Sequence, residues 1–498
     1  MGRKLLVGSS MCGILATLVL CVGGADSQSP LASNLPPGIR EYVMCDDDLV
    51  ALLHVKVIDG TGQAPRPDQT LVIRDGKIAA LGDSSATPTP PGAKVLDLAG
   101  HSVFPGLVGM HEHMFYTSAL DLDAEGKVVP HLSEISFTAP RLYLAAGVTT
   151  IRTTGSIEPY TDLDTKEQID ANRAVGPKMD VTSPYLEGPP RRFPQMHELT
   201  SPDDARRMVA FWADAGVTSF KAYTHITNAE LGAAIKEAHK RHLKVTGHLC
   251  SVGWREAAAL GIDDFAHGPT GTDSEFVIGK QHDQCPETAA VWDSWAKMEI
   301  SSAPVRELIR DLVDRGISVT STIANTETQT PGRPDPQQRV LDVLSPQSRA
   351  SYLAQRARGP VVASASDQQL KTVFNREMQF EYAFANSGGM LMAGSDPTGI
   401  GGTVPGFANQ REVELLVEAG FTPLEAIHIA TYNGARYLGE LDHIGTIAPG
   451  KQADLVVVKG DPSSQISDIE AVEMVFKDGI GYNPAKLLNS VRGLVGLR

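Results

Sequence analysis

The sequence predicts an α/β protein: a (β/α)8 TIM barrel accompanied by a small β-sandwich domain built from both chain ends. Between about residues 105 and 440, apolar strand-like segments alternate with helical segments, and several helices end in a glycine directly before the next strand. Eight such strands in about 330 residues are typical of a barrel with insertions. Short strands with Asp-Gly turns occur near both chain ends.

The first 25 residues have the pattern of a secretory signal peptide. Arg3 and Lys4 precede an apolar stretch at 14–22, and small residues up to Ala25 follow it. The apolar run is shorter than a membrane-spanning helix requires. We therefore predict cleavage near Ala25 and export to the periplasm or the medium, without stable membrane insertion.

Composition narrows the class of partner. The formal net charge is −15 over 498 residues, which argues against nucleic acid because that partner requires a basic surface. Three cysteines lie beyond the predicted signal peptide: Cys45, Cys250 and Cys285. None belongs to a C-x-x-C motif, which disfavours a thiolate zinc site, and their pairing stays open.

The small domain is predicted from alternating strands at both ends. Segments 53–60 and 70–78 alternate apolar and polar residues. The same strand-like pattern occurs near the C-terminus, in segments 444–447, 453–458 and 474–479. We expect residues 45–104 and 441–490 to form one β-sandwich domain. The barrel at 105–440 is then inserted between its two parts.

The barrel is predicted from strands that follow one another with helices between several of them. The expected strands are 103–110, 148–152, 179–182, 217–220, 243–246, 262–266, 317–320 and 390–393, and helical stretches include 201–215, 228–242 and 306–315. A doubly wound open sheet is the alternative, but no G-x-G-x-x-G motif follows the first strand. The long polar span 323–367 after the seventh strand is either a lid over the barrel mouth or a flexible insertion.

Candidate metal ligands stand at the ends of several predicted strands. His111 and His113 close the first strand, and side chains two residues apart on a strand point to the same face. The carboxyl ends of barrel strands meet at one mouth, so residues far apart in the chain can share a site there. The later candidates at such ends are Lys221, His248, His267 and Asp396.

This pattern resembles the amidohydrolase superfamily, in the branch with a lysine on the fourth strand. Segments 104–113, 431–439 and 445–455 resemble the opening strand, the closing helix and the return to the β domain of that family. Within the branch, the sequence is most similar to prolidase-like and imidazolonepropionase-like members. The resemblance covers nearly the whole chain after the signal peptide.

The resemblance implies a binuclear hydrolase with two divalent metal ions, zinc being the usual metal. His111, His113 and Asp396 would hold one ion, His248 and His267 the other, and a carboxylated Lys221 would bridge both. A metal-bridging hydroxide would attack the substrate, with Asp396 acting first as general base and then as general acid.

The predicted function is hydrolysis of an amide or peptide bond in a small molecule of the dipeptide or N-acyl-amino-acid type. A cyclic amide or lactone hydrolase is the alternative on the same site, and a non-catalytic binding barrel is a third hypothesis. Mononuclear deaminases would show H-x-x-E around the strand-5 histidine, whereas Leu249, Cys250 and Ser251 follow His248. The family also forms homo-oligomers, and the sequence does not decide this.

Four residues are candidates for substrate contacts. Arg152 ends the second strand and could bind a substrate carboxylate with two hydrogen bonds, or form an internal ion pair. Tyr223, Tyr185 and His131 could each polarise a substrate carbonyl. These residues lie in or near loops, where one sequence says little about their orientation.

Overall fold

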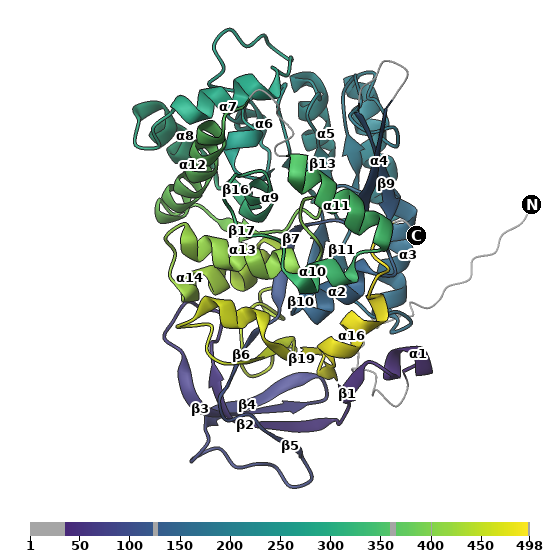
Figure 1. The fold of residues 1–498 in the computed structure, drawn as a ribbon, viewed down its shortest axis with the longest axis vertical. Helices are drawn as coiled ribbons and strands as arrows, with labels where there is room; N and C mark the ends of the chain where they lie inside the picture. Colours follow the sequence, from purple (N-terminus) through teal and green to yellow (C-terminus); the bar gives the residue numbers. More distant parts are fainter. Residues whose placement is uncertain (1–34, 123–127, 359–364, 400, 497–498) are drawn as a thin grey trace, which may run out of the picture.

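The computed structural model describes residues 35–122, 128–358, 365–399 and 401–496. The predicted signal peptide lies outside the described residues. Figure 1 shows the barrel in the upper part of the molecule, with strands from both chain ends, coloured purple and yellow, below it. None of the helices in the described part of the chain combines the length and the apolar composition needed to cross a bilayer.

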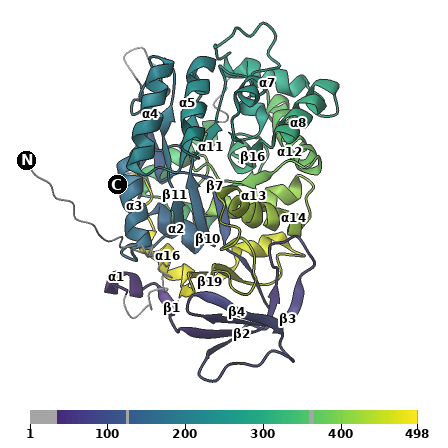
Figure 2. The ribbon, with the colours of Figure 1, turned by 180° about the vertical axis from the view of Figure 1, so that it is seen from behind.

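Eight parallel strand positions form the barrel, as predicted. The third position is occupied by two short strands, β11 and β12, which Val181 separates. The barrel closes where the backbone N–H groups of Ser395 and Asp396 donate to the carbonyl of His111. The strands are β7 (Leu107–Glu112), β10 (Val148–Thr153), β11 (Lys178–Asp180), β12 (Thr182–Leu186), β13 (Ser219–Ala222), β14 (Lys244–Gly247), β15 (Asp264–Ala266), β16 (Ser318–Ser321) and β17 (Leu391–Ala393). Figure 2 labels β7, β10, β11 and β16 among them.

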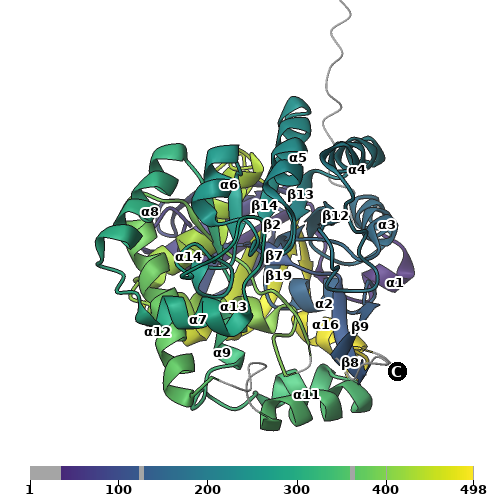
Figure 3. The ribbon, with the colours of Figure 1, turned by 90° about the horizontal axis from the view of Figure 1, so that it is seen from above.

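Helices surround the barrel, as the view from above shows (Figure 3). They are α2 (Ala139–Ala145), α3 (Pro159–Asp170), α4 (Pro202–Ala215), α5 (Asn228–Lys240), α6 (Trp254–Leu260), α7 (Thr288–Lys297), α8 (Ala303–Arg315), α9 (Ile323–Thr328), α10 (Gln338–Val343), α11 (Pro346–Arg358), α12 (Asp367–Asn386), α13 (Phe407–Glu418), α14 (Pro423–His428) and α15 (Gly434–Leu438). Two short helices, α1 (Pro37–Arg40) and α16 (Pro484–Val491), lie near the chain ends.

The predicted helix-to-strand turns are present, with the expected caps. The Ser201 side chain accepts a hydrogen bond from the Asp204 N–H group and begins α4, which Gly216 ends at φ 106°. Gly316 ends α8 at φ 70°. Because side chains disfavour this left-handed conformation, glycine can turn the chain directly into the next strand.

The two chain ends meet in one sheet. Its nine strands are β1 (Val43–Cys45), β2 (Leu49–Val57), β3 (Arg66–Arg74), β4 (Lys77–Asp83), β5 (Lys94–Asp97), β6 (His101–Pro105), β18 (Leu455–Lys459), β19 (Val472–Lys477) and β20 (Ile480–Tyr482). The antiparallel pair β6–β18 joins the two ends. Side chains of β2, β3, β18 and β19 share one buried core that includes Val50, Leu71, Leu455 and Phe476. The predicted domain boundaries stay a prediction.

Two local expectations need correction. The single strand expected at 103–110 is two strands, because Gly106 separates β6, which pairs in the small sheet, from β7, which pairs with β10. A Cβ atom at Gly106 would collide with the side chain of Thr149, so the crossing point needs glycine. Residues 444–447 form no strand.

Two further features concern the barrel mouth. An unpredicted hairpin, β8 (Phe115–Leu122) with β9 (Val128–Glu134), follows His113. The span 323–367 contains α9, α10 and α11, so its described part is largely helical. Residues 359–364 of this span lie outside the described part of the chain.

Candidate metal centre

Three predicted ligands come together where β7 meets the end of β17. The Nε2 atom of His113 lies 3.0 Å from Oδ1 of Asp396, and Nε2 of His111 lies 3.5 Å from the same oxygen. One ligand atom from each of the three residues lies within 4.8 Å of the others. All three side chains are buried. This grouping can hold a metal ion.

The two other predicted histidines extend this group. His248 follows β14 and His267 follows β15, and the centroids of their rings are 4.6 Å apart. The ring of His267 is also 4.4 Å from that of His111, and its Nδ1 atom is 3.9 Å from Oδ2 of Asp396. The four imidazoles therefore form one continuous cluster around the carboxylate.

Lys221 lies on β13 with only 1% of its surface exposed. Its Nζ atom is buried and has no hydrogen-bond partner among the described residues. Burial lowers the pKa of Lys221 to about 7, against the opposing effect of Asp396 and with a smaller contribution from Arg152. A substantial fraction of this amine is therefore neutral near pH 7.

Burial also determines the charge of three of the imidazoles. It lowers the pKa of His267 to about 4, and the pKa of His111 and of His248 falls well below the ordinary value. For Asp396, burial alone would raise the pKa, but the hydrogen bond from His113 and the neighbouring charges lower it. The site thus combines neutral imidazoles at His111, His248 and His267 with an ionised carboxylate.

The residues present fit metal ions of the zinc type. Neutral imidazole and carboxylate are ligands that zinc and similar divalent metals prefer. The Nδ1 atoms of His111 and His113 and the Nζ atom of Lys221 are buried without hydrogen-bond partners in the described part of the chain. Unpartnered buried polar atoms are costly, so their convergence indicates a site that a ligand completes.

Glu112, between the two histidines, joins two elements at the barrel closure. Its carboxyl group accepts hydrogen bonds from the Ser395 N–H group at 3.1 Å, from the Ser395 hydroxyl and from Nδ2 of Asn409 at 2.6 Å. Burial raises the pKa of Glu112 to about 8. Its side chain therefore links the end of β7 to the segment after β17 and to α13, and we assign it no metal.

Two residues of the site adopt unusual backbone conformations. Asp396 has φ 41° and His267 has φ 72°, in the left-handed region that disfavours residues with a Cβ atom. Such conformations cost about 1–3 kcal/mol each and persist where surrounding contacts hold them. Their position at two predicted ligands is consistent with a functional site.

Sequence reasoning missed the residues that follow β16. The Asn325 side chain donates to Oδ2 of Asp396 at 2.6 Å, and Oγ1 of Thr322 lies 2.6 Å from Nδ1 of His267. Only the position of this segment could have pointed to these residues: it follows the carboxyl end of a barrel strand, which faces the barrel mouth, and the sequence had suggested no candidate there.

Arg152 is an internal ion-pair partner, which corrects its expected role as a substrate contact. Its guanidinium donates to Oδ2 of Asp264 at 2.7 Å and to the carbonyl of Met110 at 2.8 Å. With 1% of its surface exposed, Arg152 cannot reach a substrate in this conformation.

Tyr223, in contrast, lies beside a candidate metal ligand, and Tyr185 lies beside Tyr223. The ring of Tyr223 is 4.9 Å from that of His248, and the ring of Tyr185 is 4.8 Å from that of Tyr223. His131 lies exposed on β9, in the hairpin that follows the first barrel strand. Its predicted substrate role stays a prediction.

Further aromatic side chains continue this side of the site. Phe115 stacks on His113 with ring centroids 4.4 Å apart, and Phe193 lies 6.4 Å from Tyr223. These four rings (Phe115, Tyr185, Phe193 and Tyr223) belong to one apolar cluster, which we call the aromatic wall. The wall contacts two of the candidate metal ligands, His113 and His248.

Arg192 is an exposed cation beside the aromatic wall. It precedes Phe193, and its charge contributes to lowering the pKa of His248. Burial raises the pKa of Tyr223 to about 12, and the charge of Arg192 opposes this rise. No hydrogen bond or ion pair of the Arg192 side chain occurs within the described residues. Sequence reasoning missed this arginine because nothing in the loop pattern distinguishes it from a solvated surface charge.

A disulfide connects two of the three cysteines whose pairing the sequence left open. Cys250 and Cys285 are bonded, with Cα atoms 4.9 Å apart, whereas Cys45 is a free, buried thiol. Cys250 is two residues beyond His248. The bond thus ties the segment after the fifth barrel strand to the segment before α7.

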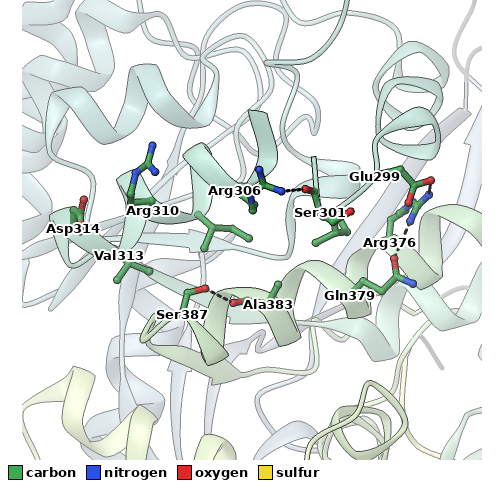
Figure 4. A pocket seen from close by; sticks show the side chains of 12 residues that line it. Glu299, Ser301, Arg306, Arg310, Val313, Asp314, Arg376, Gln379, Ala383 and Ser387 are labelled. Carbon is green, nitrogen blue, oxygen red and sulfur yellow. Dashed lines mark hydrogen bonds and ion pairs between the residues drawn. The ribbon is translucent and has the colours of Figure 1, made fainter. Parts of the chain in front are cut away.

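One groove on the protein surface is separate from this centre. It has a volume of ≈ 780 Å³ and lies on the outer flank of the barrel, between α8 and α12 (Figure 4). Arg306, Arg310 and Arg376 are among its lining residues, and none of the candidate metal ligands lines it. We therefore assign it no part in the chemistry of the metal centre.

Comparison with known proteins gives a family match and a shared fold. Residues 348–480 match the model of the Amidohydrolase family. The bottromycin amidohydrolase is 20% identical with a TM-score of 0.67, over 93% of this chain and 96% of that one. A Xaa-Pro dipeptidase with bound methionine in its active site is 19% identical with a TM-score of 0.64, over 87% of this chain and 100% of that one. These structural similarities show the fold.

Similarity to curated proteins is confined to short stretches. Adenine deaminase 1 of Carboxydothermus hydrogenoformans is 42% identical over 67 residues, which are 14% of this chain and 10% of that protein. The match thus spans about a tenth of the length of this curated relative.

Proposed function

We propose that this chain, which has an amidohydrolase-type fold and matches the Amidohydrolase family over residues 348–480, is a metal-dependent hydrolase that cleaves C–N bonds in small molecules. One observation carries the proposal. Four imidazoles, one carboxylate and an unpartnered buried lysine from five different strand ends converge at the barrel mouth. Function resides in such sites rather than in the fold.

We assign His111, His113 and Asp396 to one divalent ion, His248 and His267 to a second, and Lys221 to both. Bound metal ions supply Lewis acidity and lower the pKa of water. The depressed pKa of Lys221 provides the neutral amine that carbon dioxide requires for carboxylation. Carboxylation would convert this neutral amine into an anion with two oxygen ligands and release a proton.

In this proposal the proton moves through Asp396. The carboxylate is ionised and accepts a proton from the attacking water as a general base. It then delivers this proton to the leaving nitrogen as a general acid, so that the C–N bond breaks without releasing an unstable amide anion. The buried position of the carboxylate limits competition from bulk water.

We propose a dipeptide or N-acyl-amino-acid substrate with a free carboxylate and an apolar side chain. The aromatic wall offers apolar contacts beside both His113 and His248. Arg192 offers a guanidinium that could pair with a carboxylate. The name of one structural neighbour, Xaa-Pro dipeptidase, agrees with this substrate class.

Two other classes of substrate are candidates for the same site. A cyclic amide or a lactone remains the alternative. Deamination of a purine is a second candidate, because a curated relative with a short matching stretch is an adenine deaminase. The unpartnered Lys221 favours the binuclear hydrolase over a mononuclear deaminase.

We also propose that the mature protein is exported after cleavage near Ala25. The Cys250–Cys285 disulfide supports this proposal, because disulfides persist mainly in oxidising compartments.

A panel assay tests the proposed function. The purified protein is treated with a chelator, reloaded with zinc, manganese or cobalt, and incubated with dipeptides, N-acyl amino acids, lactones, cyclic amides and adenine. We expect metal-dependent release of amino acids, with the chelated protein as the matched control. Ammonia release from adenine, or lactone opening alone, would replace the proposed substrate class. No metal-dependent turnover of any substrate would contradict the hydrolase itself.

A further inference from the structure

Asn325 contacts the central carboxylate of the metal centre from the seventh strand end. It lies on α9, which starts two residues after β16. Its Nδ2 atom donates to Oδ2 of Asp396 at 2.6 Å and approaches the backbone carbonyl of the same residue at 3.3 Å. One amide group therefore contacts both the side chain and the main chain of Asp396.

The two oxygens of the Asp396 carboxylate have different neighbours. Oδ1 lies 3.0 Å from His113 and 3.5 Å from His111, whereas Oδ2 accepts from Asn325. A carboxylate bound on both oxygens cannot rotate freely about its Cβ–Cγ bond. Asn325 therefore determines which oxygen faces the pair of histidines.

The backbone of Asp396 also needs support. Its φ of 41° is in the left-handed region, and such a conformation persists only where neighbours hold it. The Thr403 hydroxyl donates to the Asp396 carbonyl, which Asn325 also approaches. The backbone N–H of Asp396 donates to the carbonyl of His111 at 2.9 Å. Asn325 is thus part of the set of contacts that maintains this conformation.

Hydrogen bonds to the backbone of α9 hold Asn325 in place. Glu412 on α13 is fully buried, and its carboxyl group accepts from the Ile323 N–H at 3.2 Å and the Ala324 N–H at 2.7 Å. At the other end of α9, the Thr328 hydroxyl donates to the Asn325 carbonyl at 2.7 Å. The helix therefore presents the Asn325 amide from an anchored backbone.

We propose that Asn325 is a positioning residue for Asp396: its amide holds the carboxylate in the orientation from which it accepts and returns the proton during hydrolysis. This inference rests on the proposed function. Hydrogen bonds to a ligand or catalytic carboxylate orient it, and their loss costs about 10–100-fold in activity or metal affinity.

The test uses the full mature protein with Asn325→Ala, Asn325→Asp and Thr326→Ala. Thr326 lies on the same short helix, and its side chain makes no hydrogen bond within the described residues, so it is the matched control. For each protein, kcat and KM on the best substrate, bound metal per chain and the melting temperature are measured.

We expect Asn325→Ala to lower kcat about 10–100-fold, with KM within about threefold and with wild-type metal content. Asn325→Asp should lower kcat further, because it replaces the donor by a second carboxylate beside Oδ2. Thr326→Ala should resemble the wild type. A lowered kcat with little change in KM and in metal content distinguishes a positioning role from a merely structural one.

Three results would overturn the inference. An unchanged kcat in Asn325→Ala would show that the amide does not position Asp396. A raised KM with unchanged kcat would make Asn325 a substrate contact instead. Loss of metal together with kcat would make it a support of the metal site rather than of the proton transfer. Turnover by the wild type and by Thr326→Ala establishes the proposed function independently of all three.

Discussion

The Nε2 atom of His113 lies 3.0 Å from Oδ1 of Asp396, although 283 residues separate the two in the chain. The contact joins the end of the first barrel strand to the end of the eighth. Because parallel barrel strands bring their carboxyl ends to one mouth, such a pair forms only when the whole barrel is closed. The candidate metal centre is therefore a property of the complete fold.

Asp396→Asn should abolish most turnover while the protein stays folded. An amide cannot accept the proton of the attacking water, so we expect kcat to fall about 100-fold to 10,000-fold. Steady-state kinetics and the melting temperature measure the two effects separately. Asp442→Asn, at an exposed aspartate outside the barrel, is the control and should retain full activity. A kcat within tenfold of the wild type would exclude Asp396 as the proton carrier.

Arg192→Gln should weaken binding of substrates that carry a free carboxylate. A charge-assisted hydrogen bond is worth about 1.5–3 kcal/mol, so KM should rise roughly 10–100-fold for the acid. For the methyl ester of the same substrate KM should change little. Arg191→Gln removes the neighbouring exposed arginine and is the matched control. Equal effects on acid and ester would show that Arg192 does not recognise the carboxylate.

Much of the fold can be predicted from local sequence patterns. A glycine after a helix and the apolar segment beyond it predicted several barrel strands within two residues, as at β10 and β16. The H-x-H motif needed no tertiary information, since the alternation of a strand fixes that both side chains share a face. The five strand ends at which the sequence places candidate ligands are strand ends in the structure as well, and the metal-binding roles of these residues stay a prediction.

The remaining features depend on contacts between distant segments. The break at Gly106 is set by the approach of Thr149, which no local pattern near residue 106 encodes. Arg152 and Asp264 pair inside the barrel, and the sequence alone could not separate this from a substrate contact. Asn325 lies on the short helix α9 and Arg192 in a loop, and packing against other segments at the barrel mouth sets the directions of both side chains.

The Cys250–Cys285 disulfide should stabilise the protein measurably. The two cysteines are separated by 35 residues, and closing a loop of that length in the unfolded chain stabilises the native state by about 4 kcal/mol. A reductant should therefore lower the denaturant midpoint of the wild type and leave a Cys250→Ser/Cys285→Ser variant unaffected. Cys45→Ala should still respond to the reductant. An unchanged midpoint on reduction would mean that the bond does not contribute.

Glu412 should make the stability depend on pH in a defined direction. Burial raises its pKa from 4.5 to about 7, so the folded state favours the protonated form. The raised pKa of Glu412 adds on the order of 3 kcal/mol to the free energy of unfolding at low pH. This contribution is fully present below about pH 4.5 and is lost as the pH rises through about 7. Between pH 5 and 8, the free energy of unfolding should decline less with rising pH in Glu412→Gln than in the wild type. Parallel pH profiles would contradict this.

Elemental analysis of the wild type and of Lys221→Ala, combined with hydrolysis of the dipeptide and N-acyl-amino-acid panel, tests the central claim most directly. We predict two divalent metal ions per chain in the wild type, fewer in Lys221→Ala, and amino-acid release that falls together with the metal. Lys244→Ala, at the start of β14 on the opposite end of the barrel strands, is the control and should retain its metal. A wild-type protein that binds no metal after exposure to zinc, manganese or cobalt would contradict the account.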